Sequence, residues 1–303
     1  MLFRSPARVY HQRGAQFVDA TAASGLEGLS GNVLGGALAD VDDDGDLDLA
    51  LARFGTVGSG TQHFFRNEDG TFVAATAEAG LGTLTPMSFT PNFADMDGDG
   101  VLDLLFVSDF HFTRVYKGLG GGLFEDVTTS VIDDENGMGA TLGDYDADGD
   151  LDWFVTSIWD PNGFAEGLWG ITGNRLYEND GAGNLVDVSE AAGVREGYWG
   201  WATCFADFDN DGHLDIFMTN GFASSEAVEF YEDPDRLYVA NGDGTFTERS
   251  IELGIVSTGQ GRGVSCADFD RDGHVDILVQ QNQGPLALYR NNGAGAGAWF
   301  GVA

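Results

Sequence analysis

The chain has 303 residues, 43% of them hydrophobic and 12% aromatic, which is enough apolar material for a large core. Its formal net charge is −35, from 49 acidic and 14 basic residues. A surface of this sign repels phosphate backbones and anionic lipids, so we expect no nucleic-acid partner. We also expect no membrane insertion, because no apolar run approaches the length of a transmembrane helix.

An acidic nine-residue motif, first seen as DVDDDGDLD at residues 40–48, recurs four times along the chain. Every copy has acids at positions 1, 3, 5 and 9 and glycine at position 6. Alternate carboxylates that turn inward, with a glycine that allows a sharp bend, are typical of a site for a hard, oxygen-ligated cation. Position 7 varies between Asp, Val and His, so we expect its backbone carbonyl to bind. The predicted ion is calcium, about five in all. The copies occupy residues 40–48, 95–103, 144–152, 207–215 and 268–276.

The predicted ligands therefore share five equivalent positions in each motif, with position 7 acting through its carbonyl. They are Asp40, Asp42, Asp44, Asp46 and Asp48; Asp95, Asp97, Asp99, Val101 and Asp103; Asp144, Asp146, Asp148, Asp150 and Asp152; Asp207, Asp209, Asp211, His213 and Asp215; and Asp268, Asp270, Asp272, His274 and Asp276.

Two other structures could contain an acidic motif of this length. An EF-hand needs a bidentate Glu at position 12 and flanking helices, whereas position 12 here is always apolar and each motif runs into a short apolar segment of strand type. Metal-free acidic turns are the second alternative. At the effective dielectric constant of a protein surface, four carboxylates in one short turn would repel one another by roughly several kcal/mol unless a cation lay among them.

A second motif alternates with the first: an apolar–aromatic pair, a turn rich in Asn, Asp and Gly, and another strand. This pattern predicts hairpins. One repeat is then four strands, and four-stranded units every 50–60 residues are typical of propeller blades. We therefore predict an all-β fold, a β-propeller in one domain, 1–303. The copies lie at 9–21, 64–76, 115–128, 176–189, 237–250 and 288–303.

The only two cysteines precede the fourth and fifth acidic loops by three and two residues. Side chains alternate along a strand, so Cys204 and Cys266 should face opposite sides of their sheets. We therefore expect free buried thiols rather than a disulfide.

The loops ADVDDDGDLDLAL, ADMDGDGVLDLLF and ADFDNDGHLDIFM resemble FG-GAP/VCBS repeats, the calcium-loop blades of integrin α-subunit propellers. The interleaved LYxNxGxGxFxDVT pattern resembles the cartilage acidic protein-like branch. Residues 293–303 are similar to the start of an ASPIC/UnbV domain. The resemblance implies the fold more specifically than an activity.

Five acidic loops and six hairpins predict five full blades and an N-terminal half-blade. Propellers of this family commonly have seven blades, which leaves two alternatives open. The chain is a segment of a larger propeller, or its N-terminal hairpin pairs with C-terminal strands to close a small ring.

We expect an extracellular binding or adhesion module for a protein or glycan, in which calcium is structural. Its location would be secreted, periplasmic or cell-surface, although residues 1–14 lack the apolar segment of a signal peptide. The alternative is a carbohydrate-active enzyme, a polysaccharide lyase or hydrolase. No catalytic motif supports it, and we predict no catalytic residue.

The ligand is expected on the face opposite the calcium loops, where the connections vary most in length. Exposed aromatic side chains on such loops give large contact area at low entropic cost. The predicted contacts are Trp159, Trp169, Trp199 and Phe222.

Overall fold

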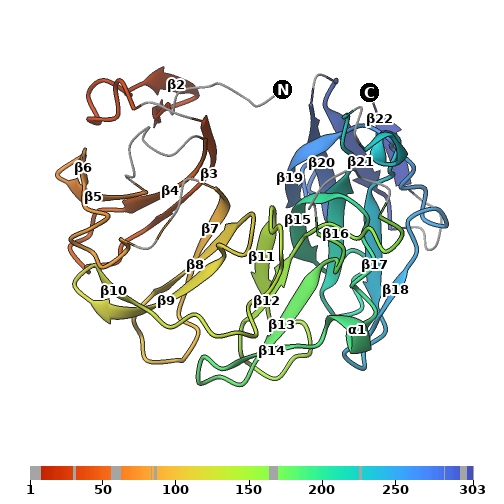
Figure 1. The fold of residues 1–303 in the computed structure, drawn as a ribbon. Helices are drawn as coiled ribbons and strands as arrows, with labels where there is room; N and C mark the ends of the chain where they lie inside the picture. Colours follow the sequence, from red (N-terminus) through yellow and green to blue (C-terminus); the bar gives the residue numbers. More distant parts are fainter. Residues whose placement is uncertain are drawn as a thin grey trace. The chain divides into compact units, whose positions relative to one another are not determined.

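The computed structural model describes residues 8–29, 32–55, 63–82, 84, 87–163, 170–224, 227–282, 284–293 and 299–302, the last range as backbone only. The chain forms two compact units, Met1–Ile132 and Asp133–Ala303. Within the described ranges almost all regular structure is β-strand (Figure 1). The exceptions are a one-turn helix, α1 (Ser189–Ala192), and a 3-10 turn, Val228–Phe230. None of the helices in those ranges is long and apolar enough to cross a membrane.

Unit 1 contains a two-stranded hairpin and two four-stranded antiparallel sheets, in which each strand pairs with the next along the chain. The hairpin is β1 (Tyr10–Arg13) and β2 (Gln16–Asp19). Blade 1 consists of β3 (Asn32–Ala39), β4 (Asp48–Phe54), β5 (Phe64–Glu68) and β6 (Thr71–Ala74). Blade 2 consists of β7 (Ser88–Ala94), β8 (Asp103–Ser108), β9 (Arg114–Gly120) and β10 (Leu123–Asp126).

Unit 2 contains three sheets of the same topology. Blade 3 consists of β11 (Ala140–Gly143), β12 (Asp152–Val155), β13 (Arg175–Asn179) and β14 (Leu185–Asp187). Blade 4 consists of β15 (Gly200–Ala206), β16 (Asp215–Asn220), β17 (Arg236–Ala240) and β18 (Phe246–Glu248). Blade 5 consists of β19 (Gly261–Ala267), β20 (Asp276–Gln281), β21 (Ala287–Asn291) and β22 (Trp299–Val302).

Sequential four-stranded antiparallel sheets are the blades of a β-propeller. The prediction of an all-β propeller arrangement with five full blades and an additional N-terminal hairpin is therefore confirmed. The stretch 293–303, in which we expected an ASPIC/UnbV-like domain to begin, provides β22, whose backbone pairs with β21.

The second strand of each blade is apolar without alternation because both of its faces are covered. In β16, Ile216 and Met218 join the apolar cluster shared by blades 3 and 4, whereas Phe217 joins the cluster shared by blades 4 and 5. In blade 1, Ala50 lies in the cluster shared with blade 2 and Leu49 lies in a cluster on the other side. The continuous apolar runs after the acidic loops thus follow from blades that stack on both faces.

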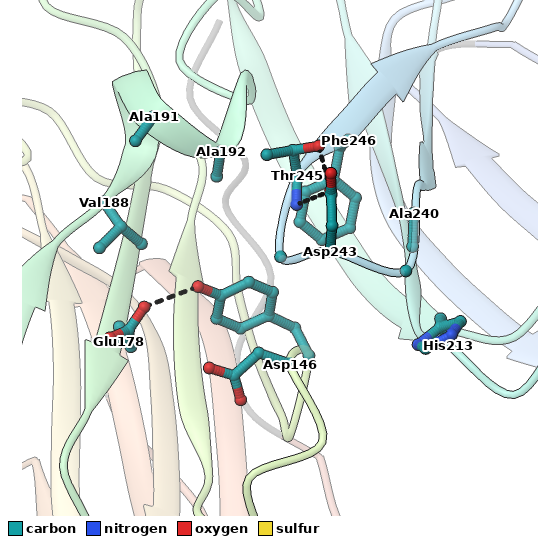
Figure 2. Close-up of a pocket in the computed structure, with 13 residues that line it drawn as sticks. Asp146, Glu178, Val188, Ala191, Ala192, His213, Ala240, Asp243, Thr245 and Phe246 are labelled. Atoms are coloured by element: carbon teal, nitrogen blue, oxygen red, sulfur yellow. Dashed lines mark hydrogen bonds between the residues drawn. The ribbon is translucent and has the colours of Figure 1, made fainter.

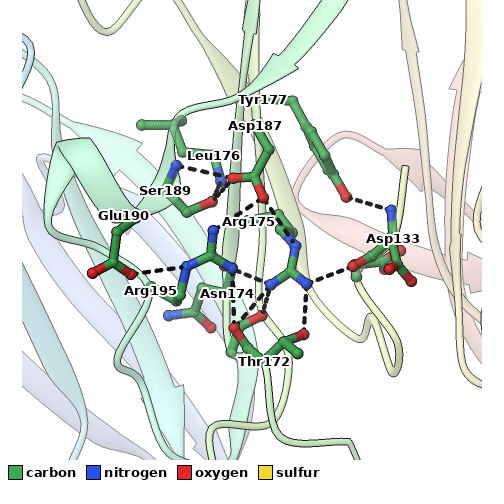
Figure 3. Close-up of polar contacts among 12 residues, drawn as sticks. Asp133, Thr172, Asn174, Arg175, Leu176, Tyr177, Asp187, Ser189, Glu190 and Arg195 are labelled. Atoms are coloured by element: carbon green, nitrogen blue, oxygen red, sulfur yellow. Dashed lines mark hydrogen bonds and ion pairs between the residues drawn. The ribbon is translucent and has the colours of Figure 1, made fainter. Parts of the chain in front are cut away.

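A polar network fixes the connections of blade 3 (Figure 3). The buried guanidinium of Arg175 donates to the carbonyl oxygen of Asp133 (2.6 Å) and pairs with Asp187 (3.4 Å). Arg195 also pairs with Asp187 (3.0 Å). Although burial opposes ionisation of Asp187, hydrogen bonds from Ser189 and the charge of Arg195 lower the pKa of this carboxyl. Charge-assisted bonds therefore hold the segment before α1, in addition to the apolar packing of Val188 against the cluster between blades 3 and 4.

The expectation of free thiols is wrong: Cys204 and Cys266 form a disulfide, with their Cα atoms 6.6 Å apart. The bond can form because the two cysteine side chains lie on opposite faces of their respective sheets. Cys204 lies beside the cluster between blades 4 and 5, and so does Cys266, because consecutive blades stack face to face. Cys204 and Cys266 belong to the first strands of two different sheets, so side chains on opposite faces of these strands can meet between the sheets.

Replacing both cysteines with serine should lower the free energy of unfolding by about 2–4 kcal/mol, because the bond closes a loop of 62 residues in the unfolded chain. Denaturant unfolding of the variant and the wild type measures the difference, and wild type kept in reductant should match the variant. Thiol titration in denaturant should find no free thiol before reduction and two afterwards. Two reactive thiols in unreduced protein would contradict the bond.

Candidate metal centres and ligand face

Each acidic loop joins the first strand of a blade to the second and is closed by its own carboxylates. In the second loop, the N–H of Asp99 donates to Oδ1 of Asp95 (3.1 Å) and the N–H of Gly100 donates to Oδ2 of Asp95 (2.8 Å). The same two bonds, to the acid at position 1, occur in all five loops. This explains why position 1 is invariably an acid in this chain.

Two positions of the loop have left-handed backbone. The glycine at position 6 has φ between 84° and 104° in every copy, in agreement with the sharp bend that we predicted. Position 4 is also left-handed in all five loops, with φ of 61° at Asp43 and 59° at Asn210, for example. The left-handed backbone at position 4 was not predicted, although Gly98 and Asn210 indicate it, since Gly and Asn tolerate this conformation best.

The acid at position 9 connects the loop to the third strand. In the fourth loop, Oδ2 of Asp215 accepts from the N–H of Phe208 (3.0 Å) and Oδ1 accepts from the N–H of Ala240 in β17 (2.8 Å). The other four loops repeat this pair of bonds. Burial raises the pKa of Asp152 and of Asp215 to about 7, even though the N–H donors lower it.

In each blade three carboxylates bring oxygen atoms within 4.8 Å of one another. Five acidic triads could therefore hold metal ions. The donors are all oxygen, which suits a hard cation, and the charge of such an ion would offset the cost of burying the acid at position 9. Within the described residues, Oδ1 of Asp42 is buried without a hydrogen-bond partner, as expected of an atom meant for an ion. The triads are Asp40, Asp42 and Asp44; Asp95, Asp97 and Asp99; Asp144, Asp146 and Asp152; Asp207, Asp209 and Asp215; and Asp268, Asp270 and Asp276.

The side chain at position 7 lies against the hairpin turn of its own blade. A Cβ atom added to Gly242 would be 3.0 Å from Nε2 of His213, and one added to Gly181 would be 2.4 Å from Oδ2 of Asp150. The glycines of these hairpins therefore make room for position 7. Binding of an ion by the carbonyl at position 7 stays a prediction.

The residue after the third-strand aromatic differs between blades, being Arg66, Lys117, Glu178, Val239 and Arg290 in blades 1–5. The ammonium of Lys117 bonds to Asp97 and, at 2.9 Å, to Asp99. Arg290 likewise pairs with Asp270 (2.5 Å). These residues were not predicted from the loop motifs, because they lie on another strand and contact the loop only in the folded blade.

Blade 3 differs because Glu178 occupies this position and accepts a hydrogen bond from the hydroxyl of Tyr145 (2.9 Å). Burial, followed by the charges of Asp148 and Glu178, raises the pKa of Asp146. Beside these groups lies a cavity of about 400 Å³ between blades 3 and 4 (Figure 2).

The four aromatic residues predicted to contact a ligand have different surroundings. Trp159 and Phe222 are half-buried, and Trp169 lies outside the described residues. Trp199 is only 2% exposed, and its ring stacks on that of Phe222 with centroids 4.2 Å apart. Trp199 therefore packs against the ring of Phe222 and offers almost no exposed surface of its own to a ligand. Trp201, which we did not select, extends this cluster and carries the guanidinium of Arg262 3.8 Å from its ring centroid.

Two buried carboxylates hold the backbone around this aromatic cluster. Oδ2 of Asp233 accepts from the N–H of Trp199 (3.3 Å), and Oδ1 of Asp235 accepts from the N–H of Asn220 (3.2 Å). Burial raises the pKa of Asp233 to about 6 and that of Asp235 to about 7, although the same N–H groups lower it. In blade 3 the equivalent acceptor is a neutral residue, Asn174.

The fold and the loops together define a β-propeller with an acidic triad in every blade. The chain belongs to the FG-GAP-like repeat family, whose model matches residues 40–106, 95–155, 162–218 and 225–279. The FG-GAP repeat model also matches residues 199–245.

Among curated proteins, the chain is similar to cartilage acidic protein 1. The Xenopus tropicalis protein is 25% identical over 279 residues, which is 84% of this chain and 41% of that protein. The Mus musculus protein is 28% identical over 202 residues, or 62% of this chain and 28% of that protein. The chain thus spans less than half the length of these relatives.

Among solved structures, the chain resembles an Agrocybe aegerita lectin described for specific recognition of non-reducing terminal N-acetylglucosamine. The TM-score is 0.54 at 18% identity, covering 97% of this chain and 73% of the lectin chain. At this identity the likeness shows a shared fold.

Replacing Asp235 with Asn should stabilise the protein, and more so as pH rises. Because the folded-state pKa of about 7 lies above the unfolded value near 4, the contribution of this carboxyl is complete below about pH 4 and is lost as pH rises through about 7. Asn stays neutral throughout. The gain in unfolding free energy should therefore grow from near zero at pH 4 to on the order of 2–4 kcal/mol at pH 8, measured by urea denaturation.

The matched control is the reverse exchange in blade 3. Asn174→Asp should lower the free energy of unfolding, by little at low pH and by more as the pH rises and the new carboxyl ionises. If the Asp235→Asn difference were independent of pH, ionisation of this buried carboxyl would not be its cause.

Proposed function

We propose that the chain is an extracellular calcium-binding propeller module that binds a protein or glycan ligand, with calcium in a structural role. The observation that carries this proposal is the recurrence of an oxygen-only acidic triad at the same turn of all five blades. The ligands would be the carboxylates at positions 1, 3, 5 and 9 and the carbonyl at position 7. Since position 9 also binds the third strand, an ion there would stabilise three strands of its blade.

An extracellular location is supported by two features of the chain. The disulfide between Cys204 and Cys266 joins two consecutive blades, and such bonds persist in oxidising compartments. Extracellular calcium modules bind the ion with dissociation constants of about 10⁻⁴–10⁻³ M, so the loops would fill outside cells and stay empty in cytosol.

A binding role is supported by the relatives, which are named as cartilage acidic proteins and a lectin rather than for an enzymatic activity. The lectin's recognition of N-acetylglucosamine makes a glycan the first ligand class to test. The proposed contact surface is the end of the blades opposite the calcium loops, where Phe222 and Trp159 are half-buried. Half-buried aromatic rings supported by packing are typical of binding hot spots.

Calcium should raise the stability of the folded protein. At 10 mM calcium, dissociation constants of 10⁻⁴–10⁻³ M correspond to about 1.4–2.7 kcal/mol for each filled loop. Asp209→Asn, which neutralises one acid of the fourth triad, should reduce the bound calcium by about one ion and reduce the calcium-dependent stabilisation. Calorimetric titration of metal-stripped protein and thermal melts measure both quantities.

The control for this experiment is Asp69→Asn, which removes one exposed negative charge at a hairpin turn outside the loops. It should keep the full number of ions and the full stabilisation. Melts of wild-type protein that are indifferent to calcium would reject the structural role.

Trp159→Ala and Phe222→Ala should each weaken binding to a ligand found on a glycan array or in a pull-down by about tenfold or more, as truncation of a central aromatic contact does. Phe17→Ala, which removes a 71% exposed ring from β2, is the control and should leave affinity unchanged. Unchanged affinity in both test variants would show that this end of the blades is not the binding surface.

A further inference from the structure

The cavity between blades 3 and 4 lies at the end of the blades that carries the acidic loops. One side comes from blade 3, through Asp146, Glu178 and α1, and the other from the hairpin between β17 and β18 (Figure 2). Its volume of about 400 Å³ is within the range of small-ligand pockets. All of its lining residues belong to unit 2.

The lining combines an apolar wall with carboxylates. Val188, Ala192 and Phe246 contribute apolar surface, and the ring of Phe246 stacks on that of Tyr145 with centroids 5.8 Å apart. Asp146, Glu178 and Asp243 contribute negative charge, and none of the residues that line the cavity is Lys or Arg. Glu178 and Asp243 lie outside the acidic loops, so an ion bound in the third loop would leave their charges available.

Two other blades show what this position can hold. In blade 2 the ammonium of Lys117 bonds to the acids at positions 3 and 5 of its loop, and in blade 5 Arg290 pairs with the acids at the same positions. The equivalent residue in blade 3 is Glu178, which has the opposite charge and points toward the cavity (Figure 2). Blades 2 and 5 therefore have a basic side chain beside the acidic loop at this position, and blade 3 does not. In blade 3 the cavity lies next to Glu178 instead.

We propose that this cavity receives a lysine or arginine side chain of a partner protein. The aliphatic part of the side chain would lie on Val188, Ala192 and Phe246, while its charged end would meet Glu178, whose charge stays available when the third loop holds its ion. This arrangement would place a basic group of the partner beside the third acidic loop, as Lys117 lies beside the second. The inference deepens the proposed binding function, since it names a class of partner and a second contact surface on the loop side of the blades.

The test uses a blocked pentapeptide, acetyl-Gly-Gly-Lys-Gly-Gly-amide, added to calcium-saturated protein. Amide and methyl resonances of Ala192 and Ala240, which line the cavity, should shift with a dissociation constant in the millimolar range, as expected for a single side chain. The same peptide with Nε-acetyl-lysine, which keeps the stem and removes the charge, should cause at least tenfold weaker binding. Equal shifts with the two peptides would overturn the proposal.

Variants separate the pocket from the general negative charge of the protein. Glu178→Lys, which places a basic side chain where Lys117 lies in blade 2, should abolish peptide binding, and Glu178→Gln should weaken it several-fold. Glu125→Gln makes the same change in net charge on the exposed surface of blade 2 and should have no effect. A loss as large in Glu125→Gln as in Glu178→Gln would mean non-specific attraction and would reject the site.

Two further outcomes keep the conclusions separate. Shifts of Ala192 and Ala240 with N-acetylglucosamine but not with the lysine peptide would assign the cavity to a sugar and overturn the basic-side-chain proposal. Calcium melts of each variant show whether the blades are intact. In the wild-type protein, absent peptide binding together with normal calcium stabilisation would reject this inference alone, whereas absent calcium stabilisation would reject the proposed structural role of calcium.

Discussion

The structure depends most on the buried carboxylate at position 9 of each acidic loop. Its two oxygen atoms accept backbone N–H groups from the loop and from the third strand, so one side chain fixes the turn between strands 1 and 2 and the register of strand 3. Burial makes the charge costly, as the raised pKa of Asp215 shows. The neighbouring acids of the loop add to this cost, and a bound cation would remove it. The way in which a blade is assembled therefore produces a cluster of carboxylates that could hold a cation.

The blades share one backbone arrangement but differ in the charge beside their acidic loops, because single residues vary between them. The residue after the third-strand aromatic is basic in blades 1, 2 and 5, acidic in blade 3 and apolar in blade 4. In blades 2 and 5 the side chain at this position contacts the acids of the loop, whereas Arg66 in blade 1 bonds to the carbonyl oxygen of Gly121, so one residue changes the charge beside the triad. Repetition thus gives the fold its stability, while substitution at a few facing positions makes one interface distinct from another.

Contacts between consecutive blades decide features that one blade alone does not contain. The disulfide joins the first strands of blades 4 and 5, and the cavity lined by Asp146 and Phe246 exists only where blades 3 and 4 meet. Asn210 of the fourth loop also bonds to Nδ1 of His274 in the fifth (2.8 Å). The fourth and fifth acidic loops therefore contact each other and do not act as isolated turns.

The class of fold, the number of full blades and the five acidic loops could all be predicted from the amino-acid sequence. This was possible because the loop chemistry is local: nine consecutive residues contain the carboxylates and the glycine bend, and the apolar runs mark the buried strands. Three features could be seen only in the tertiary structure: the disulfide between Cys204 and Cys266, the stacking of buried Trp199 on Phe222 and the contact of Lys117 with its loop. These depend on which faces of separate strands and blades meet, and side-chain alternation within one strand carries no information about the neighbour that will cover it.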